Sequence, residues 1–125
     1  MDTFTLAYIG CALWASTDDN GEPLDANYSV DDFAPEALAL MEADCASFQR
    51  KHARELEQYC ERINRVTDDP PIAYAAHDFW LTRNHEGAGF WDRGLGSLGD
   101  DLTNGADAYG ECWLVVGDDG KLYIH

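Results

Sequence analysis

Basic side chains are scarce in this sequence, and the first 49 residues contain none. Eight Lys and Arg stand against 24 Asp and Glu, which gives a formal net charge of −16. A surface of that sign repels the phosphates of nucleic acids and the anionic headgroups of membranes. The composition therefore argues against direct binding of nucleic acid or membrane, and it favours a partner with a basic surface.

Long apolar segments and the features of a signal peptide are also missing. No run approaches the roughly 20 apolar residues that span a bilayer. The start, Met1-Asp2-Thr3-Phe4, lacks a basic n-region, so we expect a cytoplasmic protein. A length of 125 residues with 46% hydrophobic side chains fits one domain, residues 1–125, around a single core.

Paired cysteines are the third absence. The four cysteines, Cys11, Cys45, Cys60 and Cys112, are dispersed and never form the CxxC pairs that are typical of zinc sites. Their neighbours are mostly apolar or aromatic, so we expect free thiols in the core. The sequence thus predicts no bound metal and no cofactor.

Three segments have the periodicity of amphipathic helices. The first covers residues 4–16, where Asp2 or Thr3 can cap the N-terminus. The second and clearest covers residues 36–64, as one helix or two nearly continuous helices, and the helix-breaking residues of segment 67–71 end it. Its apolar stripe consists of Leu38, Met41, Cys45, Phe48, His52, Leu56, Tyr59 and Ile63. The third covers residues 97–109.

Two further regions predict strands. Residues 77–83 contain aromatic and β-branched side chains, which favour a strand. Residues 112–116 and 121–124 flank Asp118-Asp119-Gly120, which are the turn residues of a hairpin. The expected fold class is therefore α+β, with about three helices on one face of a small antiparallel sheet of about three strands that ends in a C-terminal hairpin.

A group of histidine and carboxylate side chains predicts one alternative function. His77, Asp78, His85 and Asp92 could bind a divalent metal or supply a general base. In a strand, however, His77 and Asp78 would point to opposite faces. No motif for a metalloprotease, a phosphate-binding loop or a nucleophile elbow accompanies them. A metal-dependent enzyme or small-ligand binder stays the alternative, and we assign no catalytic residues.

The aromatic side chains near this group allow two interpretations. Two of them, Phe79 and Trp80, precede the glycine-rich segment 84–99. The other two, Phe90 and Trp91, lie within it. They can form the core beneath the sheet, or some of them can be exposed as anchors for a partner, because Trp and Tyr are common in interface hot spots.

The acidic side chains are the feature that most needs an explanation. Five Asp-Asp doublets fall at predicted turns and helix starts, where aspartate is common. Together, however, they repel one another and work against the compact state. They imitate the phosphate array of DNA or dock onto a basic protein surface, unless they are an adaptation to high salt or simply an acidic composition without a specific use. The candidate partner-binding residues are Asp18, Asp19, Glu22, Asp25, Asp31, Asp32, Glu36, Glu42 and Asp44.

Two stretches of the sequence resemble a known group of proteins. The segment from His77 to Gly94, HDFWLTRNHEGAGFWDRG, is similar to a segment of small uncharacterised proteins of phages and prophages. Cys11-Ala12-Leu13-Trp14 and the segment 21–28, GEPLDANY, resemble the same group. Where that group has Gly-His after Asn84, this chain has His85-Glu86. The resemblance implies a mobile genetic element as the source, and small acidic proteins of such elements are often counter-defence factors.

The leading hypothesis is therefore a non-enzymatic acidic inhibitor. It would block a nucleic-acid-binding defence complex of the host, such as a CRISPR effector or a restriction enzyme, by DNA mimicry or acidic docking. A third possibility is a structural or regulatory phage protein that pairs with a basic partner. The apolar stripe of residues 36–64 also allows a homodimer, so a monomer and a homodimer both stay open.

Overall fold

The structure is a computed structural model that describes residues 1–63 and 69–125. Its regular elements there are five α-helices and one two-stranded antiparallel sheet, so the α+β class is confirmed. Short 3-10 turns lie at Leu24–Ala26, Val30–Asp32 and Phe90–Asp92. The helices are α1 (Thr3–Ala15), α2 (Pro35–Lys51), α3 (Ala53–Arg62), α4 (Pro71–Arg83) and α5 (Ser97–Asp107), and the strands are β1 (Leu114–Val116) and β2 (Leu122–Ile124).

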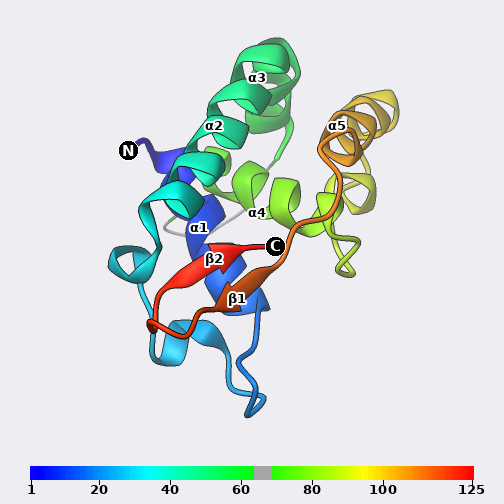
Figure 1. The fold of residues 1–125 in the computed structure, drawn as a ribbon. Coiled ribbons are helices and arrows are strands. Elements are labelled where there is room, and N and C mark those ends of the chain that lie inside the picture. The colour runs from blue at the N-terminus through cyan, green and yellow to red at the C-terminus, as the bar shows by residue number, and fades with distance from the viewer. Residues whose placement is uncertain (64–68) are drawn as a thin grey trace.

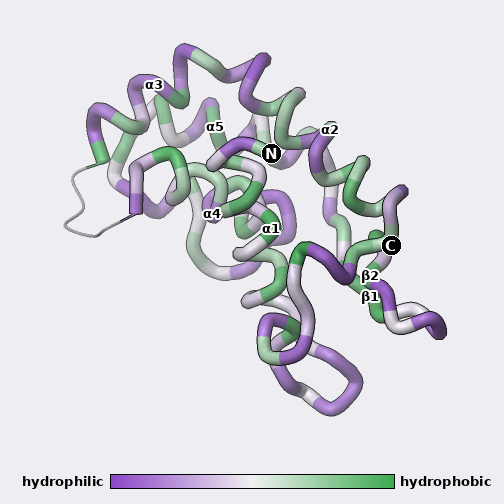
Figure 2. The backbone as a smooth tube through the Cα atoms, turned by 90° about the vertical axis from the view of Figure 1, so that its left-hand side faces the viewer, coloured by the Kyte–Doolittle hydropathy of each residue, from purple (hydrophilic) through white to green (hydrophobic). Residues whose placement is uncertain are grey.

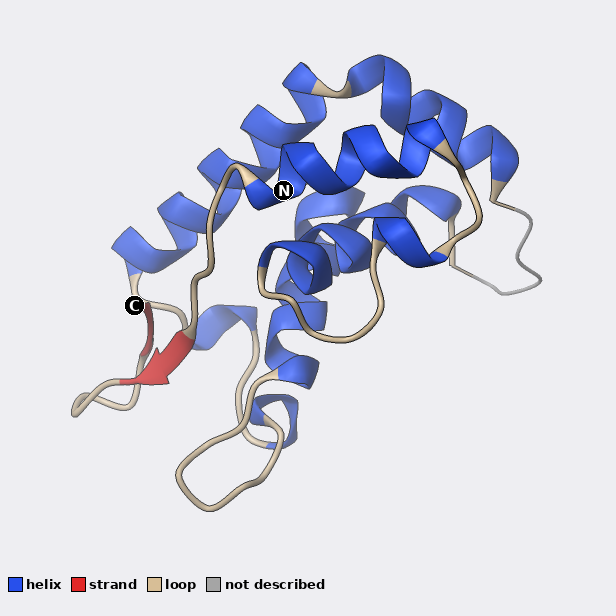
Figure 3. Cartoon of the chain, turned by 90° about the vertical axis from the view of Figure 1, so that its right-hand side faces the viewer, coloured by secondary structure: helices blue, strands red, loops and turns tan. Residues whose placement is uncertain are grey.

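The helices surround α4, which packs against α1, α3 and α5 (Figure 1). Helix α2 packs against α1 and continues into α3. The sheet lies at one end of the helices beside the start of α2 (Figure 3). The predicted layer of helices over one face of a sheet is thus matched only roughly, because strands of three residues offer too small a face to cover.

Capping explains where α1 begins. The Asp2 carboxylate accepts a hydrogen bond from the Thr5 N–H at 2.8 Å, so Asp2 is the N-cap that the sequence allowed. The predicted helix over 36–64 consists of two helices within the described residues, and His52 lies at the break. The His52 ring packs directly against Gly105 of α5, and a Cβ at position 105 would lie only 2.5 Å from the ring. Residue 64 and part of the predicted breaker segment 67–71 lie outside the described residues.

The prediction of a strand at 77–83 is wrong, because these residues form the second half of α4. Pro71 occupies the first turn, where its missing N–H costs nothing. Aromatic propensity favoured a strand, but helices on several sides of α4 bury its side chains almost all round. A helix buried in this way has no polar stripe, and so it has no 3.6-residue periodicity to detect.

The sheet consequently has two strands and not three. The antiparallel register pairs Val115 with Tyr123 and Val116 with Leu122. The predicted turn is confirmed, since the Gly120 N–H donates to the Gly117 carbonyl at 3.0 Å and Gly120 has a φ of +78°. On the other side of β2, Phe33 forms a parallel bridge with Leu122 that attaches the sheet to the start of α2.

Aromatic side chains form the centre of the core. Phe48 of α2 stacks on Phe79 of α4 with ring centroids 4.1 Å apart, and Tyr8 of α1 lies 5.1 Å from Phe79. All three rings are buried, and each such ring stabilises the fold by about 1.5–3 kcal/mol relative to exposure.

Across the described residues, no helix combines the length and the apolar character that crossing a membrane requires.

Candidate functional site

The loop between α1 and α2 carries most of the candidate acidic residues, and Figure 2 shows it as largely hydrophilic. Two of its carboxylates accept hydrogen bonds from the loop backbone and hold the loop in shape, and a third, Glu22, accepts one from the exposed Asn27 side-chain amide at 3.0 Å. Asp18 accepts hydrogen bonds from the N–H groups of Asn20 and Glu22, at 2.8 and 3.0 Å. Asp32 accepts one from the Ser29 N–H at 2.8 Å and completes the capping box that the sequence suggested. These two side chains therefore have a structural task whatever else they bind.

The other carboxylates of this loop extend into solvent. Asp19, Glu22, Asp25 and Asp31 are exposed, and so is Glu36 in the first turn of α2. Among the residues that the structure describes, none of these five forms an ion pair with a Lys or Arg. We call them the acidic face. Their charge is available to a partner at the cost of partial desolvation only.

Two further candidates lie elsewhere on α2. Glu42 is exposed but lies more than a turn further along α2 than Glu36. Asp44 is not free, because its carboxylate pairs with the Arg83 guanidinium at 2.8 Å. The structure therefore brings most of the predicted acidic residues to one loop and its flank, and it assigns Asp44 to the support of the fold.

Most basic side chains of the described residues are placed away from this loop; the exception is the exposed Lys121, which lies in the turn of the C-terminal hairpin. Arg83 and Arg93 lie in internal pairs with Asp44 and Asp78. The exposed bases Arg50, Lys51, Arg54 and Arg62 lie on the end of α2 and on α3, which is the opposite end of the molecule from the loop (Figure 1). Exposed acids such as Glu57 and Glu61 lie among these bases on α3, whereas the first 49 residues contain no Lys or Arg, so the field of the loop is the more strongly negative one.

The structure does not bring the predicted histidine–carboxylate group together. Asp78 is fully buried and accepts hydrogen bonds from the Tyr59 hydroxyl at 2.7 Å and from the Arg93 guanidinium at 2.7 and 3.1 Å. His85 is exposed, and its two ring nitrogens face Asp107 and Glu111. Within residues 1–63 and 69–125, no three His, Cys, Asp or Glu side chains converge to hold a metal ion.

The aromatic cluster divides between core and surface. Phe79, Trp80 and Phe90 are completely buried, whereas Trp91 is 58% exposed. Trp14 of α1 is also exposed and lies on a small cavity with His77 and Arg93. Three of the four residues therefore lie in the core, but between helices and not beneath a sheet.

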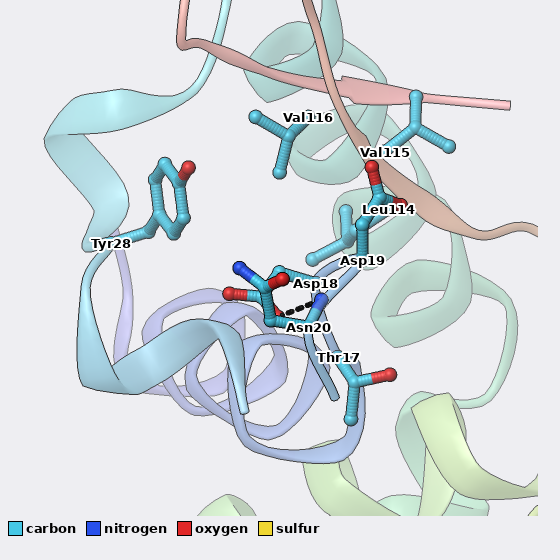
Figure 4. A pocket seen from close by; sticks show the side chains of 8 residues that line it. All are labelled: Thr17, Asp18, Asp19, Asn20, Tyr28, Leu114, Val115 and Val116. Carbon is cyan, nitrogen blue, oxygen red and sulfur yellow. Dashed lines mark hydrogen bonds between the residues drawn. The ribbon is translucent and has the colours of Figure 1, made fainter. Parts of the chain in front are cut away.

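A groove beside the acidic loop is the feature that sequence reasoning missed. It has a volume of about 330 Å³ and runs between the turn 17–20, Tyr28 and strand β1 (Figure 4). Val115 and Val116 of β1, which line it, are 41% and 40% exposed. The alternation of side chains in a strand predicts that one of the two valines points outward, but the groove depends on where the loop lies.

Burial determines the chemistry of the cysteines. Cys11, Cys45 and Cys112 are buried free thiols, and burial raises the pKa of Cys11 to about 12 and that of Cys45 further still. A thiol with such a pKa has almost no thiolate at neutral pH and is a poor nucleophile. Cys60 is only half-buried, and its pKa is raised less.

We therefore expect a thiol reagent such as DTNB at pH 8 to modify Cys60 alone in the native protein. All four cysteines become reactive after unfolding in guanidinium, because unfolding removes the burial that protects them. A Cys60→Ser variant serves as the control and should lose the native reaction. Fast modification of Cys45 in the native protein would contradict the packing of α2 against α1.

Comparison with protein-family models, with curated proteins and with solved structures finds no match to this chain.

Proposed function

We propose that this protein is a non-enzymatic inhibitor that docks its acidic face onto a basic surface of a nucleic-acid-binding protein. The partner class follows from charge, since proteins that bind nucleic acids neutralise its phosphates with Lys and Arg and therefore present a large basic surface. Taken with the resemblance to phage proteins, the proposed target is a defence complex of a bacterial host, such as a CRISPR effector or a restriction enzyme.

One observation carries this proposal. Five exposed carboxylates on residues 19–36 form no ion pair with a Lys or Arg among the described residues, and most of the exposed bases lie on the end of α2 and on α3. Carboxylates placed together repel one another, and the cost of that repulsion is removed when a basic surface approaches. The shape supports docking more than DNA mimicry, because the carboxylates lie on one irregular loop and not in a regular array along a helix.

The groups that would support the alternative of an enzyme have other tasks. Asp78 is occupied by Arg93 and Tyr59, and His85 lies at the surface between two carboxylates on different sides of its ring. No observation on the described residues favours catalysis over docking, so we propose a single function.

Capture of the partner tests the proposal directly. The tagged protein is expressed in a bacterial host, captured at moderate salt and analysed for stoichiometric partners. A nucleic-acid-binding complex that is released by added salt is the expected result, since salt screens contacts between exposed charges. A stoichiometric partner without a nucleic-acid-binding surface would instead support the structural or regulatory role, and it would overturn the inhibitor proposal.

Charge reversal identifies the docking surface. We expect the variant Asp19→Lys/Glu22→Lys/Asp25→Lys/Asp31→Lys to associate with the partner roughly tenfold more slowly or worse at low salt, because attraction becomes repulsion. The difference should shrink as salt rises. Asp18 and Asp32 are left unchanged because their carboxylates accept hydrogen bonds from the loop backbone, whereas Glu22 bonds only the exposed side chain of Asn27. Stopped-flow or biosensor association rates measure the effect.

The matched control reverses the same number of exposed acids on other elements. Glu57→Lys/Glu61→Lys/Asp100→Lys/Asp101→Lys changes the net charge equally on α3 and α5. A slower association caused by this control to the same extent would show that net charge alone matters, and it would contradict the assignment of the acidic face.

A further inference from the structure

Strand β1 has a hydrogen-bonded neighbour on one edge only. The N–H and C=O of Trp113 exchange hydrogen bonds with His125 at 3.2 and 2.9 Å, and the Gly117 N–H donates to the Lys121 carbonyl at 2.8 Å. In an antiparallel pair, residues alternate between bonding to the partner strand and pointing away from it. The backbone groups of Leu114 and Val116 therefore point to the outer edge. Within the described part of the chain, no hydrogen bond reaches them.

The opposite side of the sheet is closed. Phe33 bridges Leu122 of β2, and the Ala34 N–H donates to the Leu122 carbonyl at 2.9 Å. The sheet can thus accept another strand only beside β1. Unpaired strand edges are templates for pairing with another chain, and proteins usually cover them or block them.

The groove runs along this open edge. Leu114, Val115 and Val116 form one wall, and the turn with Asp18 and Asp19 lies opposite, as Figure 4 shows. Tyr28 lies at one side of the groove and offers a half-buried ring. An extended chain in this space would meet backbone donors and acceptors on one side and carboxylates on the other.

We propose that this groove binds an extended basic segment of the partner, which adds to the sheet as a third strand beside β1. The proposal rests on the docking function above and names the element of the partner that is recognised. Main-chain hydrogen bonds to Leu114 and Val116 hold the segment, as in other cases of strand addition. Its Lys or Arg side chains face Asp18 and Asp19, and its apolar side chains cover Val115 and Val116.

Charge complementarity decides between the possible occupants. An acidic or neutral segment gains nothing from Asp18 and Asp19. A second copy of this chain would bring its own two carboxylates to the same edge and a net charge of −16 to the encounter, so like charges oppose self-pairing. The occupant is therefore a basic segment of another protein.

A soluble model peptide tests this proposal on the whole protein. The probe is an acetylated, amidated decapeptide of alternating lysine and threonine, and NMR reports its binding at low salt. We expect the amides of Leu114 and Val116 to shift and their hydrogen exchange to slow by about tenfold or more, because the peptide bonds to them. Outward amides of β1 that neither shift nor gain protection on peptide binding would overturn the proposal.

Two changes remove the strand contact and keep the charges. Val116→Pro deletes an N–H that points away from β2, so the hairpin pairing is preserved, and Val116→Thr is the matched control that retains it. We expect Val116→Pro to weaken peptide binding by up to about tenfold, which is the effect of losing one hydrogen bond. A peptide with N-methylated alternate amides should bind the unaltered protein correspondingly weakly, and this arm does not depend on how the proline variant folds.

The outcomes separate this inference from the proposed function. If the plain and the N-methylated peptides bind equally well, and reversal of the acidic face still weakens the binding of both, strand addition is overturned and acidic docking stays in place. A homodimer in sedimentation that Val116→Pro dissociates would assign the edge to a second copy and likewise overturn the proposal.

Discussion

Replacing Arg83 with methionine is expected to lower the free energy of unfolding by about 3–5 kcal/mol. Arg83 is 4% exposed, and its guanidinium donates to the Tyr8 hydroxyl and to the Asp44 carboxylate at 3.1 and 2.8 Å. It also donates to the carbonyls of Tyr109 and Gly110 at 2.9 and 2.8 Å. One side chain thus connects α1, α2 and the segment after α5, and methionine satisfies none of these acceptors.

The measurement is thermal or chemical unfolding followed by circular dichroism. For a chain of this length the expected loss corresponds to a decrease in Tm of roughly 10–20 °C. Arg54→Met on the exposed side of α3 is the matched control and should change stability by less than about 0.5 kcal/mol. Arg83→Lys should restore little, because an ammonium group cannot reproduce the planar fork of donors. Equal stability of the Arg83→Met and Arg54→Met variants would contradict this role of Arg83.

Replacing Asp78 with alanine is expected to destabilise the protein by a similar amount, about 3–5 kcal/mol. The carboxylate has no exposed surface, and the Arg93 guanidinium binds it in a bidentate pair. Removing it leaves the Arg93 charge, which is 19% exposed, without its partner and opens a small cavity beside Tyr59. Urea unfolding monitored by tryptophan fluorescence measures the loss.

Asp92→Ala is the control for Asp78, since Asp92 is an exposed acid of the same local region. A double variant, Asp78→Leu/Arg93→Met, should be more stable than Asp78→Ala, because it removes both charges and fills the site with apolar atoms. An Asp78→Ala variant as stable as Asp92→Ala would show that the pair does not hold α4 to the segment around Arg93.

The Arg83→Met and Asp78→Ala variants test ion pairs that support the fold, as distinct from carboxylates that would bind a partner. Asp44 and Asp78 are both acidic residues that the sequence suggested for binding or chemistry, yet both carboxylates neutralise partly or wholly buried arginines. The residues of the acidic face, in contrast, should tolerate substitution with little loss of stability, because they are exposed and lack such partners among the described residues.

The sequence by itself determined the features that depend on neighbouring residues. Asp2 caps α1, the apolar stripe of α2 and α3 has helical spacing, and the residues Asp118-Asp119-Gly120 form the hairpin turn. In each case the physical cause acts over a few positions, as a capping hydrogen bond, a repeated apolar face or a glycine with positive φ. The exposure of most aspartates followed in the same way, from their preference for turns.

Only the tertiary structure decided what depends on contacts between distant segments. Helix α4 was predicted partly as a strand, because a helix surrounded by α1, α3 and α5 loses the polar stripe that identifies it. Asp44 and Arg83 are 39 positions apart, so no local pattern reveals that they neutralise each other. The groove joins residues 17–28 to residues 114–116 and exists because the tertiary fold places the α1–α2 loop beside the free edge of β1, while the bridge at Phe33 occupies the other edge of the sheet.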